Sequence, residues 1–176
     1  MKLELDLLRK ENEEVYYADL DFISLDQENI NFLIGLAKNT LRQRVRLCCH
    51  KSPQDIVHEM IIVHPRYAYV RPHMHLKKAE SMIVLEGEVD YITFKENGTI
   101  DKVISMGESR SNKPFYQSIR SEIFHSLLIK SEWLVFLEIT NGPFIKEDTV
   151  YADWSKQNPD EKEILDFIEF LKEGSP

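Results

Sequence analysis

Three residues within one short segment could bind a metal ion together. His73 and His75 are two positions apart, so on a β-strand both imidazoles project from the same face, roughly 7 Å apart. Glu80 opens a strongly β-forming run, which predicts that the chain turns and returns a carboxylate beside the two histidines. Imidazole nitrogen and carboxylate oxygen are common ligands of divalent transition metals. The segment therefore predicts a metal site rather than a hairpin that merely displays histidines.

A fourth candidate ligand, His125, begins another β-forming run further along the chain. It can join the other three only if the sheet closes on itself, as in a small β-barrel. Three neutral imidazoles and one carboxylate around a divalent ion leave a positive site with open coordination positions for water or substrate. The ligand set suits one divalent transition metal, namely Fe, Mn, Ni, Cu or Zn, and the sequence does not choose among them.

The first strand of the expected β region carries two arginines and a histidine. Arg44, Arg46 and His50 alternate with apolar residues such as Val45 and Leu47, which gives the strand one polar and one apolar face. In one interpretation the apolar face packs in the core and the arginines lie in solvent. In the other, Arg44, Arg46 and His50 line the entrance to the site, where guanidinium groups could bind phosphate or carboxylate. The sequence leaves both interpretations open.

Three further residues are candidates for binding a ligand. Tyr69 and Arg71 share the strand parity of His73, so we expect them on the metal-facing side unless Pro72 interrupts the strand. Glu138 lies within an apolar run and is either a carboxylate of the pocket or a buried group that is satisfied elsewhere.

Residues 42–140 have the pattern of a β domain. Short runs rich in β-branched and aromatic residues, separated by turn residues, predict the strands of a sandwich or small barrel. Asn97 and Gly98 predict a tight hairpin, because both tolerate the positive φ of a primed turn. His64, in a turn-like His-Pro-Arg segment, is expected in solvent. We therefore expect a mainly β chain whose sheet closes into a small barrel.

Two amphipathic helices are expected to flank the barrel. A helix capped by Asp26 or Ser24 would place its apolar residues over 30–37 on one face, and a helix capped by Asn158 would do so over 164–171. We expect one domain with three parts. Residues 1–41 are an N-terminal extension with one helix that packs on the barrel, residues 42–152 form the barrel, and residues 153–176 form the C-terminal helix.

The composition narrows the class of protein. The chain has 176 residues and a net charge of −8, and it lacks a basic stripe or an aromatic-basic repeat, which argues against a nucleic-acid partner. Cys48 and Cys49 are the only cysteines, and their adjacency disfavours a disulfide and favours a reducing compartment. Neither a signal peptide nor an apolar run long enough to span a bilayer is present. We therefore expect a cytoplasmic protein without a membrane partner.

The ligand spacing resembles the first motif of the cupin superfamily. In that motif a His-x-His pair is followed by glutamate and then by glycine, here His73, His75, Glu80 and Gly87. His125 lies where the histidine of the second cupin motif would fall. The resemblance implies a cupin-type jelly-roll β-barrel that holds a metal ion.

Over a longer stretch, residues 15–155, the chain is similar to the WbuC family of cupin-fold metalloproteins. This similarity rests on short motifs: Arg44-x-Arg46-x-Cys48-x-His50, His58-Glu59-Met60, Tyr69-Val70-Arg71-Pro72-His73, Glu138 and Gly142-Pro143-Phe144. The family occurs with genes for bacterial surface polysaccharide synthesis, and its reaction is not established. The resemblance implies a role in O-antigen or lipopolysaccharide biosynthesis.

We therefore expect a metal-binding protein that acts on or binds an activated sugar or sugar acid, a small ligand of anionic character. One alternative is an Fe(II)-dependent dioxygenase of a small polar substrate. Another is a non-catalytic module that binds a small molecule. Whether the chain is an enzyme, and whether it forms a homodimer through edge strands or helix faces, stays open.

Overall fold

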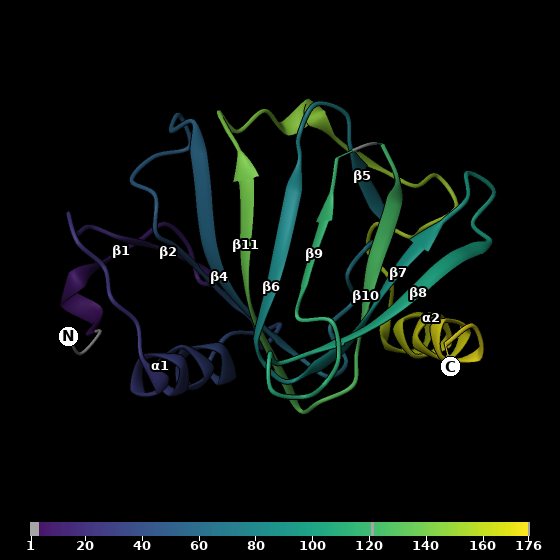
Figure 1. Cartoon of the computed structure of the whole chain (residues 1–176), viewed down its shortest axis with the longest axis horizontal. Coiled ribbons are helices and arrows are strands. Elements are labelled where there is room, and N and C mark those ends of the chain that lie inside the picture. The colour runs from purple at the N-terminus through teal and green to yellow at the C-terminus, as the bar shows by residue number, and fades with distance from the viewer. Residues whose placement is uncertain (1–3, 121, 176) are drawn as a thin grey trace.

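The β-forming runs build two sheets that face one another, with a helix at each flank (Figure 1). The computed structural model describes residues 4–120 and 122–175. The larger sheet contains, in spatial order, β1 (Leu8–Lys10), β2 (Val15–Ala18), β3 (Val45–Cys48), β4 (Val57–Pro65), β11 (Trp133–Asn141), β6 (Glu80–Glu86) and β9 (Tyr116–Ile119). The smaller sheet contains β12 (Thr149–Tyr151), β5 (His73–His75), β10 (Phe124–Ile129), β7 (Glu88–Phe94) and β8 (Ile100–Gly107).

The main core lies between the two sheets. Met82, Phe136 and Ile62 from the larger sheet pack with Tyr91 and Leu127 from the smaller sheet. Because successive side chains of a strand point to opposite faces, these residues identify the inward face of each strand. The core residues therefore show which of their neighbours, two positions away, also point inward.

The mainly β prediction is confirmed, whereas closure into one continuous barrel is not seen. Within residues 4–120 and 122–175, no strand pairs with neighbours from both sheets. The sheets instead enclose the core face to face. His125 thus meets His73 and His75 by strand pairing within the smaller sheet, and packing of the two sheets brings Glu80 to them, without the continuous ladder that we predicted.

An α-helix covers the outer face of the larger sheet. Helix α1 (Gln27–Lys38) begins after Asp26, whose side chain accepts a hydrogen bond from the Asn29 N–H while the Asn29 side chain accepts one from Asp26. This reciprocal pair satisfies two helix N–H groups. Leu33 of the helix packs with Val45 and other apolar residues of β3 and β4.

The second helix flanks the smaller sheet. Helix α2 (Glu161–Glu173) is capped by Asp160, with Glu163 as its reciprocal partner. The prediction of Asn158 as the cap was wrong by two residues, because Asp160 and Glu163 form the capping box instead. Ile168 and Leu171 pack on the outer face of β7 and β10.

The predicted hairpin joins β7 to β8, but its turn differs from the expected type. The Gly98 N–H donates to the Lys95 carbonyl, and Lys95 N–H donates to the Thr99 carbonyl. Gly98 has a φ of 84°, whereas Asn97 does not take a positive φ. The turn is therefore not the primed type, in which both central residues have positive φ.

Residues before α1 contribute more than a helix. Strands β1 and β2 pair with each other, and β2 pairs in parallel with β3, which extends the larger sheet. We had not predicted these strands, because both are short and show little alternation of apolar and polar residues. A short 3-10 turn, Leu5–Leu7, precedes β1, and a second, Lys146–Asp148, precedes β12. No helix in the described part of the chain is long and apolar enough to cross a membrane.

Candidate metal centre

The structure brings the four predicted metal ligands together. His73 and His75 lie on β5, and His125 on β10 pairs directly with His73, so all three imidazoles come from the smaller sheet. Glu80 opens β6 in the facing sheet. One ligand atom from each of the four residues lies within 4.8 Å of every other. These residues therefore form a cluster that fits a metal ion, with three ligands from one sheet and one from the other.

The outer nitrogen of each imidazole is occupied by a neighbouring oxygen. Nδ1 of His73 lies 2.8 Å from the Arg71 carbonyl, and Nδ1 of His125 lies 3.0 Å from the Ile123 carbonyl. Because a carbonyl oxygen accepts hydrogen bonds, both Nδ1 atoms carry the proton and leave the Nε2 lone pair free. Nδ1 of His75 lies 3.2 Å from the Thr149 hydroxyl. Such partners fix the orientation of histidines that bind metals.

The inner nitrogens converge on the carboxylate. Nε2 of His75 lies 3.0 Å from one oxygen of Glu80, and Nε2 of His125 lies 3.6 Å from the other. Burial disfavours ionisation of Glu80, but the nearby imidazoles of His125 and His75 outweigh it and hold the pKa of this carboxyl below its usual range. Burial, with the nearby His125, lowers the pKa of His73 to about 4. Near neutral pH, an ionised carboxylate and a neutral imidazole are thus ready to bind a cation.

His125 itself is held in place by an aromatic neighbour and by Glu80. Its ring stacks on Tyr91 at a centroid distance of 5.4 Å. Burial opposes protonation of His125, but contact with the Glu80 carboxylate outweighs burial and raises its pKa. A metal ion must therefore compete with a proton at this position, and it would replace the proton as the positive partner of Glu80.

Several buried polar atoms near the cluster have no hydrogen-bond partner among the described residues. They are Nε2 of His125, the Tyr91 hydroxyl, the Thr93 hydroxyl and Nε2 of Gln117. Thr93 pairs with His125 across β7 and β10, and Tyr91 lies one inward position further along β7. Buried polar groups are normally paired, so this concentration fits a site that receives a metal ion and a polar ligand. Sequence reasoning missed Tyr91 and Gln117, whose only signal is strand parity.

Glu138 also points toward this interior. It pairs with Met82 on one side and Met60 on the other, and both of these methionines belong to the core between the sheets. Burial, and then the negative charge of Glu80, raises the pKa of the Glu138 carboxyl to about 7. The interpretation of Glu138 as a carboxylate of the pocket is thus the one that the geometry favours.

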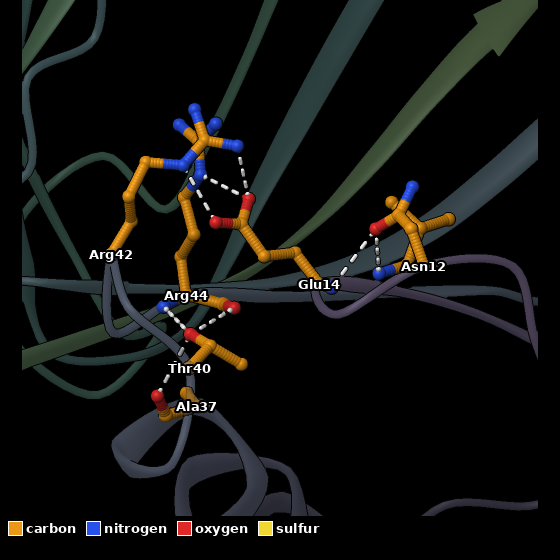
Figure 2. A network of polar contacts seen from close by, with 7 residues as sticks. Asn12, Glu14, Ala37, Thr40, Arg42 and Arg44 are labelled. Carbon is orange, nitrogen blue, oxygen red and sulfur yellow. Dashed lines mark hydrogen bonds and ion pairs between the residues drawn. The ribbon is translucent and has the colours of Figure 1, made fainter.

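Arg44 lies away from the metal ligands and is paired. Figure 2 shows the guanidinium groups of Arg44 and Arg42 together at the carboxylate of Glu14, with nitrogen–oxygen distances of 2.7 and 2.5 Å. Val45, next to Arg44, pairs with Val63 of β4. Near the other end of β4, His58 pairs with Thr140 of β11, which pairs in turn with Glu80 of β6. Arg44 precedes Val45, so it lies six residues along β4 from the row of Glu80, roughly 20 Å away.

The other residues in and near β3 are divided between the two faces of the sheet. Val45 and Leu47 pack under α1, and Cys48 lies in the core between the sheets. Arg46 shares the face of Cys48 but is exposed. His50 is buried and stacks on His58 at 4.2 Å, and its Nδ1 accepts the Glu59 N–H. His50 therefore has a structural partner on each side.

Tyr69 and Arg71 contact the segment after β12 instead of the metal ligands. The Tyr69 hydroxyl donates to the Lys156 carbonyl, and Arg71 donates to Ser155. The strand begins only at His73, so Pro72 does interrupt the parity that would have aimed both residues inward. The Arg71 carbonyl nevertheless orients His73 by accepting the hydrogen bond from its Nδ1.

His64 is not the solvated residue that we expected. It lies within β4, and its Nδ1 is buried without a partner among the described residues. Burial, together with the nearby Arg44 and Arg46, lowers its pKa to about 3. Pro65 is the last residue of β4, so His64 lies within the strand, and the turn that we expected at His64 begins only after Pro65.

Comparison with known proteins supports the fold and assigns no activity. Residues 25–106 match a family described as a domain of unknown function (DUF6016), which is less than half of the chain. No curated protein matches the chain. The similarity to the WbuC family stays a prediction.

Among solved structures, SO0799 from Shewanella oneidensis aligns with a TM-score of 0.54 at 5% identity, over 69% of this chain and 82% of that chain. Oxalate decarboxylase from Bacillus subtilis, which has Mn(II) centres, aligns with a TM-score of 0.44 at 16% identity, over 55% of this chain and 24% of that chain. CapF, a capsular polysaccharide assembling protein from Staphylococcus aureus, aligns with a TM-score of 0.46 at 18% identity, over 56% of this chain and 27% of that chain. The chain thus spans about a quarter of the last two proteins. At such identities the likeness concerns the fold.

Proposed function

We propose that this chain is a cupin-type protein of the WbuC kind that binds one divalent transition metal through His73, His75, Glu80 and His125. The observation that carries the proposal is the orientation of the three imidazoles. Two donate Nδ1–H to backbone carbonyls, and the inner nitrogens face a buried carboxylate from the opposite sheet. This arrangement matches the ligand set and the outer-shell contacts of a metal site.

We further propose that the protein uses this site to bind or transform a small polar ligand, in particular an activated sugar or sugar acid of bacterial surface polysaccharide biosynthesis. The sugar class rests on the sequence resemblance, and the polar character rests on the unpartnered Tyr91 and Gln117 atoms beside the cluster. When bound, the metal would supply a Lewis acid that polarises an oxygen of the ligand. Glu138, whose pKa lies near neutrality, could accept or donate a proton beside that ligand.

The metal site is tested by reconstitution. Protein stripped with a chelator is titrated with Mn(II), Co(II), Ni(II), Zn(II) or, without oxygen, Fe(II), and the bound metal is measured by elemental analysis. We expect one ion per chain. The variant His125→Asn should bind at least tenfold more weakly, because it loses one ligand.

The matched control is His64→Asn, which replaces a partly buried histidine near the far end of β4. It should retain the affinity of the wild-type protein, provided that circular dichroism shows both variants folded. Equal metal affinity in the His125 variant and the wild-type protein would contradict the proposed site.

A further inference from the structure

Lys78 lies two residues before Glu80, one of the four candidate metal ligands. It belongs to the turn of residues 76–79, which connects β5, with its two histidines, to Glu80 at the start of β6. The Asn141 side chain holds this turn from β11: its Oδ1 accepts the Ala79 N–H at 2.8 Å, and its Nδ2 donates to the Lys77 carbonyl at 3.3 Å. The backbone on both sides of Lys78 is thus fixed relative to the ligands.

The burial of Lys78 is unusual for this chain. It is 8% exposed and is the only buried lysine in the described part of the chain. Its ammonium lies 4.8 Å from the centroid of the Phe144 ring, and among residues 4–120 and 122–175 it forms no ion pair. Lys113 and Lys130, whose side chains are 37% and 39% exposed, each contact a carboxylate.

A lysine whose side chain is nearly buried and has no anion beside it is unfavourable, because its ammonium loses part of the hydration that no opposite charge replaces. The contact with an aromatic ring offsets only part of this loss. Lys113 and Lys130 contact carboxylates although they are more exposed, so the missing anion at Lys78 is a feature of this turn. Its natural counterpart is an anion that is not part of this chain.

The charge of Lys78 also acts on the interior beside the ligands. Burial and the neighbouring His50 lower the pKa of His58, and Lys78 lowers it further. At Glu138, where burial raises the pKa of the carboxyl, the charge of Arg46 and, less strongly, that of Lys78 oppose that effect. His58 and Glu138 both point inward from the larger sheet, next to Thr140 and Met82, on the face that also carries Glu80.

We propose that Lys78 binds a carboxylate group of the ligand while another oxygen of the same molecule reaches the metal. A single ammonium is a compact charge with three donors, which matches one singly charged carboxylate better than a phosphate dianion. The ligand class is therefore a small hydroxy or keto acid, sugar acids included. This inference rests on the proposed function and deepens it, because it assigns the anionic end of the ligand to Lys78 instead of the predicted arginines.

The test uses Mn(II)-loaded protein titrated by calorimetry with oxalate, lactate, glucuronate and inorganic phosphate. Lys78→Met removes the charge, and Lys77→Met removes that of the exposed neighbour in the same turn as the matched control. We expect at least one carboxylate to bind the wild-type protein and the Lys77 variant, and to bind the Lys78 variant at least tenfold more weakly. Lys78→Arg should restore part of the affinity.

The thermal midpoint without ligand distinguishes a binding role from a structural one. If the ammonium is unpaired in the free protein, Lys78→Met should keep or raise the midpoint. A lowered midpoint would overturn the proposal, because it would show a structural partner for the charge.

The remaining outcomes separate the two proposals. Equal carboxylate affinity in the Lys78 variant, no binding by any carboxylate, or a Lys78-dependent affinity for phosphate alone would overturn the carboxylate site. In each of these cases, one Mn(II) per chain would leave the proposed metal function standing. A wild-type protein that binds no metal would instead overturn the proposed function.

Discussion

Glu138 couples the chemistry of the site to the stability of the fold. Its carboxyl has a pKa of about 7 in the folded protein, because burial and then the charge of Glu80 disfavour ionisation. In an unfolded chain the pKa of glutamate is about 4.3. Between these two values the folded protein holds a proton that the unfolded chain has released. The free energy of unfolding contributed by Glu138 is therefore greatest below the unfolded pKa and is lost as the pH rises through the folded one.

Replacing Glu138 with glutamine keeps the shape of the side chain and removes this titration. Between about pH 5 and about pH 7, Glu138 should lower the free energy of unfolding of the metal-free wild-type protein by roughly 1.4 kcal/mol per unit of pKa shift. In metal-free Glu138→Gln this contribution to the decline should be absent. Urea denaturation at a series of pH values in a chelating buffer measures it. Glu122→Gln, an exposed control, should keep the wild-type slope. An unchanged slope in the Glu138 variant would show that this carboxyl is already ionised.

At the scale of single residues, sequence spacing identified the metal cluster more readily than the groups around it. The ligands were recognisable because His-x-His fixes a shared strand face and Glu80 follows closely. Lys78 was not, because it stands beside Lys77 in a polar segment, and only the folded turn buries one lysine and exposes the other. Arg44 was a reasonable candidate from alternation alone, but Glu14, which pairs with it, lies on a segment that we had not assigned to the sheet.

At the scale of elements, the tight link between β6 and β7 joins the strand that carries Glu80 to the strand that carries Tyr91. Gly87 occupies this link with a φ of 92°, and a Cβ atom there would lie 2.4 Å from both the Ser131 Oγ and the Trp133 carbonyl oxygen. Neither the backbone conformation nor the space admits a larger residue. Gly87→Ala should therefore lower the free energy of unfolding by about 2 kcal/mol or more.

Gly35 provides the opposite case within the same chain. It lies inside α1, and no atom is within 4 Å of the position that its Cβ would take. Gly35→Ala should raise the free energy of unfolding by about 0.5–1 kcal/mol, because alanine favours the helix. Denaturant titration of both variants checks the pair. A stability loss in Gly35→Ala as large as that in Gly87→Ala would contradict the assigned roles.

Elements were predicted best where local chemistry decides them. The β7–β8 hairpin follows from Asn97-Gly98, although the turn type depends on how the strands meet, which the dipeptide does not determine. The cap of α2 was misplaced because Asn158 and Asp160 are both good caps, and the choice depends on the reciprocal contact with Glu163. Strands β1 and β2 carry too little apolar alternation to stand out, and they form because the edge of β3 is available for pairing.

At the scale of the whole molecule, the metal cluster links the two sheets. Three ligands come from the smaller sheet, and Glu80 alone comes from the larger one. Elsewhere the two sheets are held mainly by apolar packing between their inner faces. A bound ion would therefore act as a cross-link across the core, and its binding energy would add to the stability of the folded state.

Metal at about one hundred times its dissociation constant should raise the free energy of unfolding by about 2.7 kcal/mol. For a chain of this length that corresponds to a rise of roughly 5–10 °C in Tm. In Glu80→Gln the same metal concentration should give a smaller rise, and hydrogen exchange should show the added protection in the smaller sheet rather than in β6 and β11. Calorimetric scans and exchange mass spectrometry, with and without Mn(II), measure both effects. Equal protection of both sheets in the Glu80 variant would mean that the ion does not join them through this carboxylate.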